Sequence, residues 1–283
     1  MANPVMNSQN FQQQMHSGQQ QPGWYQGGQQ AGQSPYGQTQ AFGAAQASQQ
    51  HAHQQSMEDA FRAPAAGAAQ TGRMTYNDIV GKTALTLTLV IVGAAAGWFM
   101  PALMLPGAVV GLVLGLVNSF KREPSPILIM LYALAEGAFL GGISMLYNAQ
   151  FDGIVLQAVL GTLSVFAVML ALYTSGRFRP TPKLTKIFMA AMIGYMVFML
   201  LNLVLSFAGV AFLRSGTLGL VVGAIAVILA AYSLTLDFEA GAQGVKNGIP
   251  QKYSWTVAFG LTVTLIWLYV EILRILSILR SND

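Results

Sequence analysis

Long apolar runs, separated only by short polar stretches, dominate the chain from residue 73 onward. A transmembrane helix needs about 20 predominantly apolar residues to cross the hydrocarbon core of a bilayer. Seven runs come close to that length and predict transmembrane helices over residues 83–100, 103–120, 126–147, 154–173, 187–210, 217–238 and 255–279. Pro101 and Pro106 predict a tight hairpin between the first two. The pattern therefore predicts an all-α polytopic membrane protein.

The first 72 residues follow a different pattern, rich in Gln, Gly, Ala and Ser, with charge only at Glu58, Asp59 and Arg62. Such a segment cannot bury enough apolar surface to offset the entropy lost on ordering. We therefore expect a disordered cytoplasmic tail over 1–72 and a membrane domain over 73–283. An inert tail is the favoured interpretation, and self-association through its Gln/Gly/aromatic pattern stays open. No apolar segment follows a basic start, so no signal peptide is expected.

Composition supports this class and narrows the chemistry. The chain is 54% hydrophobic and 8% charged, whereas soluble domains carry about 25% charge. It has no cysteine, which excludes thiolate sites, and its histidines (His16, His51 and His53) all fall in the tail. The sequence contains no H-E-x-x-H, Tyr-Asp or Gly-x-Gly-Asp motif of an intramembrane protease. We therefore expect no enzyme and no cofactor, and without a basic patch among exposed aromatics we expect no nucleic-acid partner.

The basic residues predict the orientation. Of the 14 Lys and Arg, eleven lie before the first span or in the loops after the second, fourth and sixth spans. Two lie on the opposite side, and Arg274 lies within the seventh span. Cytoplasmic loops carry the excess of basic residues. The N-terminus is therefore predicted to be cytoplasmic and the C-terminus to lie outside, in a multi-pass protein of the plasma membrane.

Glycines recur at every fourth position within three spans: Gly93 and Gly97, then Gly107, Gly111 and Gly115, then Gly137 and Gly141. Such stripes let helix backbones approach closely. Glycine is also commoner in membrane helices than in soluble ones, but the threefold repeat favours close packing. Gln157, Asn202, Tyr195 and Tyr232 are predicted to form hydrogen bonds between helices.

Acidic residues inside the spans are the candidate functional groups. Glu271 lies within the seventh span, Asp237 at the end of the sixth and Glu136 in the middle of the third. A charge at the bilayer centre costs about 2.5–3.5 kcal/mol on translocon scales, so such groups face other helices and mark function. Glu136 is either a cation or proton ligand or a protonated acid bonded to a backbone carbonyl. Arg274 shares a helix face with Glu271, so a purely structural ion pair stays open, and so does an Arg274 side chain that snorkels outward.

Several strings resemble one family: YSLTLDF at 232–238 and LYVEILRIL at 268–276, with VNSFKREPSP at 117–126, EGAFLGGIS at 136–144 and FGLTVT at 259–264. They are similar to the actinobacterial branch of the Bax inhibitor-1/YccA family, also called the transmembrane Bax-inhibitor-motif family. The resemblance covers residues 74–280. It implies six helices in layers around a central seventh. Bacterial members are regarded as pH-sensitive calcium leak channels whose pH sensor is an aspartate pair on helices six and seven.

That pair corresponds by position to Asp237 and Glu271, with glutamate replacing the commoner aspartate. The resemblance therefore implies a proton-gated leak for calcium, which both acids would bind transiently through hard oxygen ligands. Two carboxyls a few ångströms apart are expected to share a proton and titrate together. Lys121 or Arg122 is the candidate partner of Asp237, and Arg274 that of Glu271. The alternative is a non-conducting regulator that binds another membrane protein, such as a quality-control protease.

The depth of the two acids decides whether they can meet. Sixteen residues separate Trp255 from Glu271, which places Glu271 about 24 Å from the cytoplasmic end of a helix beginning there. Residues 239–250 are polar and Gly-rich, and are predicted to be a link between helices. The acids meet only if the sixth helix continues past Asp237 or the seventh begins with a cytoplasmic turn or two.

Overall fold

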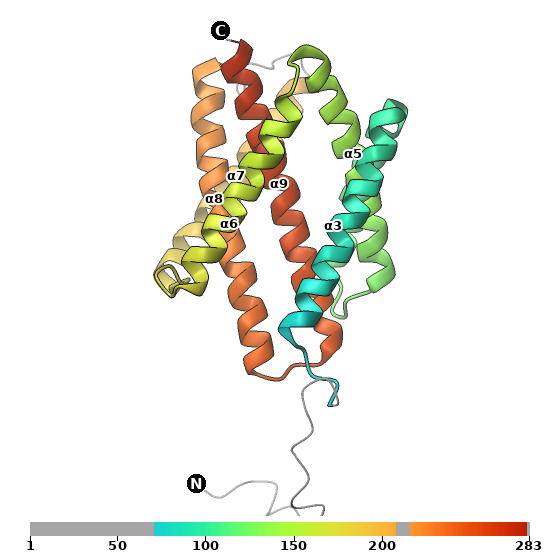
Figure 1. The fold of residues 1–283 in the computed structure, drawn as a ribbon. Coiled ribbons are helices and arrows are strands. Elements are labelled where there is room, and N and C mark those ends of the chain that lie inside the picture. Colours follow the sequence, from blue (N-terminus) through green and yellow to red (C-terminus); the bar gives the residue numbers. More distant parts are fainter. Residues whose placement is uncertain (1–70, 208–215, 282–283) are drawn as a thin grey trace, which may run out of the picture. The chain divides into compact units, whose positions relative to one another are not determined.

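A computed structural model describes residues 71–207 and 216–281, and these form helices joined by short connections (Figure 1). The elements are α3 (Tyr76–Phe99), η1 (Pro101–Leu103), α4 (Met104–Phe120), α5 (Pro126–Gln150), α6 (Ile154–Thr174), α7 (Pro182–Phe207), α8 (Gly216–Lys246), η3 (Gln251–Tyr253) and α9 (Ser254–Ser281). Seven helices within the described residues are long and apolar enough to cross a membrane, which confirms the predicted fold class. Apart from Thr71 and Gly72, the predicted disordered tail lies outside the described residues.

Helix α3 begins at Tyr76, seven residues before the predicted start of the first span. Its N-cap residue, Thr75, forms a reciprocal pair of hydrogen bonds with Asp78: the Asp78 amide donates to Thr75 Oγ1 at 3.2 Å, and the Thr75 amide donates to Asp78 Oδ2 at 2.9 Å. This capping box satisfies two amides that a helix start leaves without partners. It therefore adds almost two polar turns before the apolar run.

Helix α8 continues to Lys246, so the prediction that residues 239–250 form a link is wrong for 239–246. Gly241 and Gly244, on which that prediction partly rested, are buried contact points within the helix. Gly241 faces Ile79 of α3, and Gly244 faces the side chain of Met74. The lack of a side chain lets neighbouring residues approach, and this packing outweighs the low helix propensity of glycine. The turn falls instead at Gly248, whose φ of 62° suits glycine.

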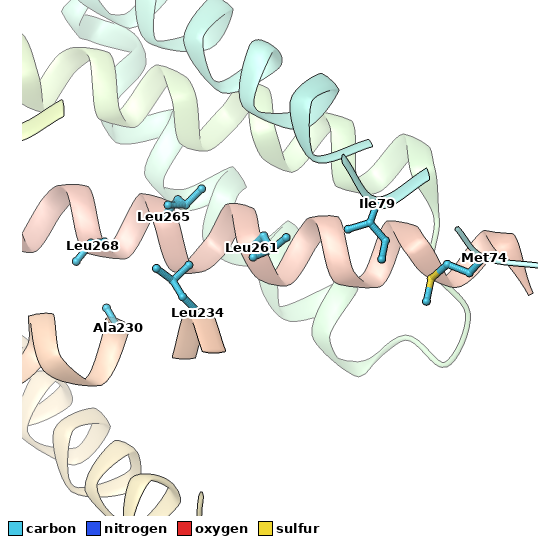
Figure 2. Packing of buried hydrophobic residues seen from close by; sticks show 7 residues of the cluster. All are labelled: Met74, Ile79, Ala230, Leu234, Leu261, Leu265 and Leu268. Carbon is cyan, nitrogen blue, oxygen red and sulfur yellow. The ribbon is translucent and has the colours of Figure 1, made fainter. Parts of the chain in front are cut away.

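Helix α9 packs against α3, α5, α6 and α8. Figure 2 shows part of this interface, a cluster of buried hydrophobic residues centred on α9: Met74, Ile79, Ala230, Leu234, Leu261, Leu265 and Leu268. The helix containing Glu271 is thus fixed by neighbours on several sides. The layered arrangement of six helices around this one stays a prediction.

The glycine stripes bring α3, α4 and α5 together. Gly93 and Gly97 of α3 lie directly against the α5 backbone, and Gly141 of α5 lies against the α3 backbone. A Cβ atom at any of these three positions would overlap backbone atoms of the facing helix. Gly107 of α4 approaches the α5 backbone in the same way, and Gly111 of α4 faces the side chain of Glu136 on α5. The predicted close packing is confirmed, and it explains how α5 lies within reach of two neighbours at once.

The segment before α3 is fixed to the connection between α8 and α9. The Met74 amide donates to the Ile249 carbonyl at 2.8 Å, and the Gln251 amide donates to the Gly72 carbonyl at 2.8 Å. The Met74 side chain is 1% exposed. The residues just before α3 are therefore hydrogen-bonded to the turn between α8 and α9, the helices that carry Asp237 and Glu271.

The α4–α5 connection reaches the same end of the helices. Lys252 in η3 forms an ion pair with Glu123 at 2.9 Å, and both side chains are exposed. Three of the basic segments predicted to share one membrane face thus lie together: the start of α3, the α4–α5 connection and the α8–α9 connection. That this face is cytoplasmic stays a prediction.

Candidate functional site

Glu271 and Arg274 form a buried ion pair on α9. Glu271 is 2% exposed and Arg274 is 8% exposed. One helical turn separates them, which places both on one face. The Nη2 and Nε atoms of Arg274 lie 2.5 Å and 3.1 Å from Glu271 Oε2. Hydrogen bonds between charged groups are shorter and stronger than neutral ones. Arg274 thus lies in direct ionic contact with Glu271.

Two neighbouring helices complete this site. Tyr195 of α7 donates its hydroxyl to Glu271 Oε1 at 2.6 Å, and Arg274 Nη1 donates to the Gly219 carbonyl of α8 at 3.0 Å. Gly223 of α8 leaves room for the guanidinium, since a Cβ there would lie 2.9 Å from Arg274 Nη2. Tyr195 does bond between helices as predicted, but no local pattern indicated that its partner is Glu271. The site therefore connects α7, α8 and α9.

Asp237 lies in a separate environment between α8 and α9. Thr264 of α9 donates its hydroxyl to Asp237 Oδ2 at 2.8 Å. Gly260, one turn earlier, makes room for the carboxyl, because a Cβ there would lie 2.7 Å from Oδ1. Sequence reasoning did not identify Gly260 or Thr264 as part of the site. Their four-residue spacing, which puts a small residue and a hydroxyl on one helix face, is the signal that could have found them.

The predicted basic partner of Asp237 is not found there. Within the described residues, neither Lys121 nor Arg122 makes a hydrogen bond or an ion pair with Asp237. Both follow the end of α4, which packs against α5, whereas Asp237 lies on α8. The packing of α4 thus keeps both basic residues away from this carboxyl.

The structure does not bring Asp237 and Glu271 together. Asp237 bonds to Thr264, whereas Glu271 lies seven residues further along α9, about 10 Å at 1.5 Å per residue. The first of the two conditions for a meeting is satisfied, because α8 continues past Asp237 to Lys246. The register of the antiparallel helices still places Gly219, and not Asp237, opposite the Glu271–Arg274 pair. The two acids therefore form two sites along one interface in this structure.

Glu136 of α5 faces Gly111 of α4, where a Cβ would lie 2.6 Å from Glu136 Oε1. The side chain is half-buried. Within residues 71–207 and 216–281, Glu136 makes no hydrogen bond or ion pair. The hydrogen bond to a backbone carbonyl that one interpretation predicted is therefore not seen among these residues. Of the other polar residues, Tyr232 bonds to Thr185 of α7 at 3.0 Å, as expected of a contact between helices.

The described residues contain no group of three or more His, Cys, Asp or Glu side chains placed to hold a metal ion. The two expected calcium ligands, Asp237 and Glu271, are surrounded instead by hydroxyls, a guanidinium and helix backbone. Such sites offer one carboxylate each, whereas a bound calcium ion takes six to eight oxygen ligands.

These observations define a multi-pass membrane protein with charged and acidic groups buried at contacts between its helices. The chain matches the family described as Bax inhibitor 1 like over residues 3–281, and it belongs to that family of non-enzymatic membrane proteins. The match includes most of the tail, which lies outside the 74–280 resemblance, and it does not resolve a branch within the family. A comparison with curated proteins finds no match.

Proposed function

We propose that this chain is a pH-sensitive, calcium-permeable leak channel of the Bax inhibitor-1 type in the plasma membrane, with its N-terminus in the cytoplasm. Asp237 and Glu271 are the gating carboxyls. The observation that supports this most strongly is their placement at successive levels of the α8–α9 interface, each accepting a hydroxyl hydrogen bond. Buried ionisable groups within membrane helices are expensive and mark ion or proton pathways. Membership of the Bax inhibitor 1 like family agrees with this role.

Protonation of Glu271 supplies the switch. The ionised carboxylate attracts Arg274 and accepts from Tyr195, so it holds α7, α8 and α9 together. A proton removes that attraction and leaves the buried guanidinium without its counter-charge, which is costly in a low-dielectric interior. The helices then favour an arrangement that rehydrates Arg274. Flux should therefore rise as the pH falls, because the change of charge biases a two-state contact between helices.

Asp237 acts at the next level along the same interface. Its Oδ2 atom accepts from Thr264, and its other oxygen has no hydrogen-bond donor among the described residues. A carboxylate with a free oxygen can contact a passing calcium ion, which prefers hard oxygen ligands. Single contacts at separate levels allow an ion to enter and leave, which conduction requires.

The test is calcium entry into liposomes that contain the purified full-length chain and a trapped calcium indicator. We expect entry above that of protein-free liposomes and faster at acidic than at neutral pH. Entry equal to that of protein-free liposomes, with folded protein recovered from the membrane, would refute the channel. It would instead favour the non-conducting regulator that binds another membrane protein.

A further inference from the structure

A pocket of about 380 Å³ lies where the start of α3 meets the end of α8. Its lining comes from two short segments, residues 73–76 and residues 245–248. Backbone contacts hold these segments side by side: the Met74 amide donates to the Ile249 carbonyl at 2.8 Å, and Arg73 pairs with Pro250 in an antiparallel β-bridge. The pocket is therefore formed by segments that the fold keeps together.

The pocket lies beyond the apolar parts of both helices. Helix α3 begins seven residues before the apolar run at 83–100, and α8 continues eight residues past the run at 217–238. At 1.5 Å per residue these ends extend about 10 Å and 12 Å from the apolar runs, which places the pocket among lipid head groups and the adjoining water. Tyr76 in the lining is 59% exposed, and tyrosine is enriched at this boundary.

Two basic side chains line the pocket, Arg73 and Lys246. Within residues 71–207 and 216–281, neither makes a hydrogen bond or an ion pair through its side chain. Gly248, two residues after Lys246, lies against the Arg73 side chain, since a Cβ there would be 3.5 Å from Nε and 3.8 Å from Cζ. The guanidinium is therefore held beside the turn that follows Lys246, and both charges border the same small volume.

The acidic residues on the same two helix ends have other partners. Asp78 accepts from Gln251 Nε2 at 2.5 Å and from the Thr75 amide at 2.9 Å. Glu239 accepts from the Tyr173 hydroxyl at 2.8 Å. Neither carboxylate lines the pocket, and none of the described residues in its lining is acidic. The pocket thus has a net positive charge, which favours an anion as its ligand.

We propose that this pocket binds the phosphate group of an anionic phospholipid. The planar guanidinium of Arg73 matches a pair of phosphate oxygens, and the Lys246 ammonium adds a second charge-assisted contact. Val80, one turn into α3 from Tyr76, is 66% exposed and offers the acyl chains an apolar surface. Basic pockets between membrane helices are typical sites for anionic head groups.

Charge distinguishes among the molecules that carry a phosphate. Phosphatidylcholine brings a quaternary ammonium beside its phosphate, which the two basic side chains repel. Phosphatidylglycerol has the same phosphodiester and no cation, so it gains both contacts without that penalty. Inorganic phosphate offers similar oxygens but has no acyl chains to bury against α3. None of this depends on calcium flux, so the outcome is separate from that of the proposed function.

The experiment measures binding of tritiated dioleoyl-phosphatidylglycerol to the purified full-length chain in detergent micelles, with tritiated dioleoyl-phosphatidylcholine as the probe of equal chain length. We expect phosphatidylglycerol to bind more tightly. Arg73→Gln and Lys246→Gln should each weaken its binding about fivefold, the usual effect of one basic residue beside an anionic membrane surface. The double variant should bind the two lipids alike.

Matched controls separate the pocket from the general positive charge of this end of the protein. Arg122→Gln and Lys121→Gln remove the same charges at exposed positions that do not line the pocket, and they should bind phosphatidylglycerol as the unmodified chain does. Arg73→Gln and Lys246→Gln should change thermal unfolding in lipid-free detergent little, because neither side chain has a partner to lose in the described part of the chain.

Three results would overturn the inference. The first is equal binding of the two lipids by the unmodified chain. The second is an affinity for phosphatidylglycerol that is unchanged in Arg73→Gln and Lys246→Gln, or that falls as much in the two control variants. The third comes from adding inorganic phosphate against sodium chloride of the same ionic strength, which should displace little lipid. Displacement by phosphate that requires Arg73 would assign the pocket to a soluble ligand instead.

Discussion

The Glu271–Arg274 pair makes a sharp prediction about stability. Glu271→Gln keeps an acceptor for Tyr195 but removes the carboxylate that Arg274 contacts at 2.5 Å. Arg274→Met leaves a glutamate that is 2% exposed without the adjacent guanidinium. Removing one partner of a buried ion pair typically costs about 3–5 kcal/mol, because the remaining charge stays buried. Each single variant should therefore lose about that much free energy of unfolding.

The double variant Glu271→Met with Arg274→Met separates the cost of an unpaired charge from the value of the pair. Buried pairs replaced by apolar residues of similar volume are often no less stable than the original. The double variant should thus recover most of the stability that each single variant loses. Such non-additivity is expected for residues in direct contact.

Thermal unfolding in detergent, followed by tryptophan fluorescence, measures these differences. Trp267 is a local reporter, since its ring centroid lies 5.6 Å from that of Tyr195, the residue bonded to Glu271. A loss of 3–5 kcal/mol corresponds to a Tm lower by about 6–20 °C for a domain of this size. Single variants that unfold within about 2 °C of the unmodified protein would refute this account of the pair.

Three further predictions concern packing and pH. Gly141→Val should lower the free energy of unfolding by about 3 kcal/mol or more, because any Cβ there overlaps the α3 backbone. Gly194 has open space around it, so Gly194→Val should change the free energy of unfolding little in the same denaturation assay. Met74→Ala should cost about 2–5 kcal/mol by the same measurement, since its side chain is fully buried. The hydrogen bond from Lys252 holds the pKa of Glu123 below its usual range. The stabilisation from this contact is therefore present at neutral pH and lost as the pH falls through that lowered pKa, so Glu123→Gln should reduce Tm at pH 7 and leave it unchanged in strong acid.

The number of membrane helices and the close packing of α3, α4 and α5 could be predicted from the sequence. Both depend on local signals, namely apolar runs of spanning length and glycines at every fourth position. The contact between Glu271 and Arg274 could also be predicted from the sequence, because a spacing of three residues puts both side chains on one face of a helix. These are properties of single segments, so no knowledge of tertiary structure was needed.

The register of α8 against α9 could not be read from the sequence in the same way. It depends on which side chains fit at particular heights, such as Arg274 beside Gly223 and Asp237 beside Gly260. The length of α8 could not be predicted either, because its last turns are polar and rich in glycine. These turns are helical because they pack against Met74 and α3. The prediction that Asp237 and Glu271 lie close together is wrong for this reason. Hydropathy predicts which residues cross the membrane, but it does not predict the register of one helix against the next.

The measurement that tests the central claim most directly is calcium flux into liposomes as the pH falls from about 8 to about 5. It compares the unmodified chain with Asp237→Asn, Glu271→Gln, their combination and the exposed control Asp152→Asn. Glu271→Gln should lose most of the rise in flux toward acid, whereas Asp237→Asn should lower flux at each pH. The combination should show both effects, since sites about 10 Å apart act nearly independently. Asp152→Asn should keep the full pH profile. An unshifted profile in both single variants would contradict the claim that these two carboxyls gate the channel, and Glu136 would then be the next residue to test.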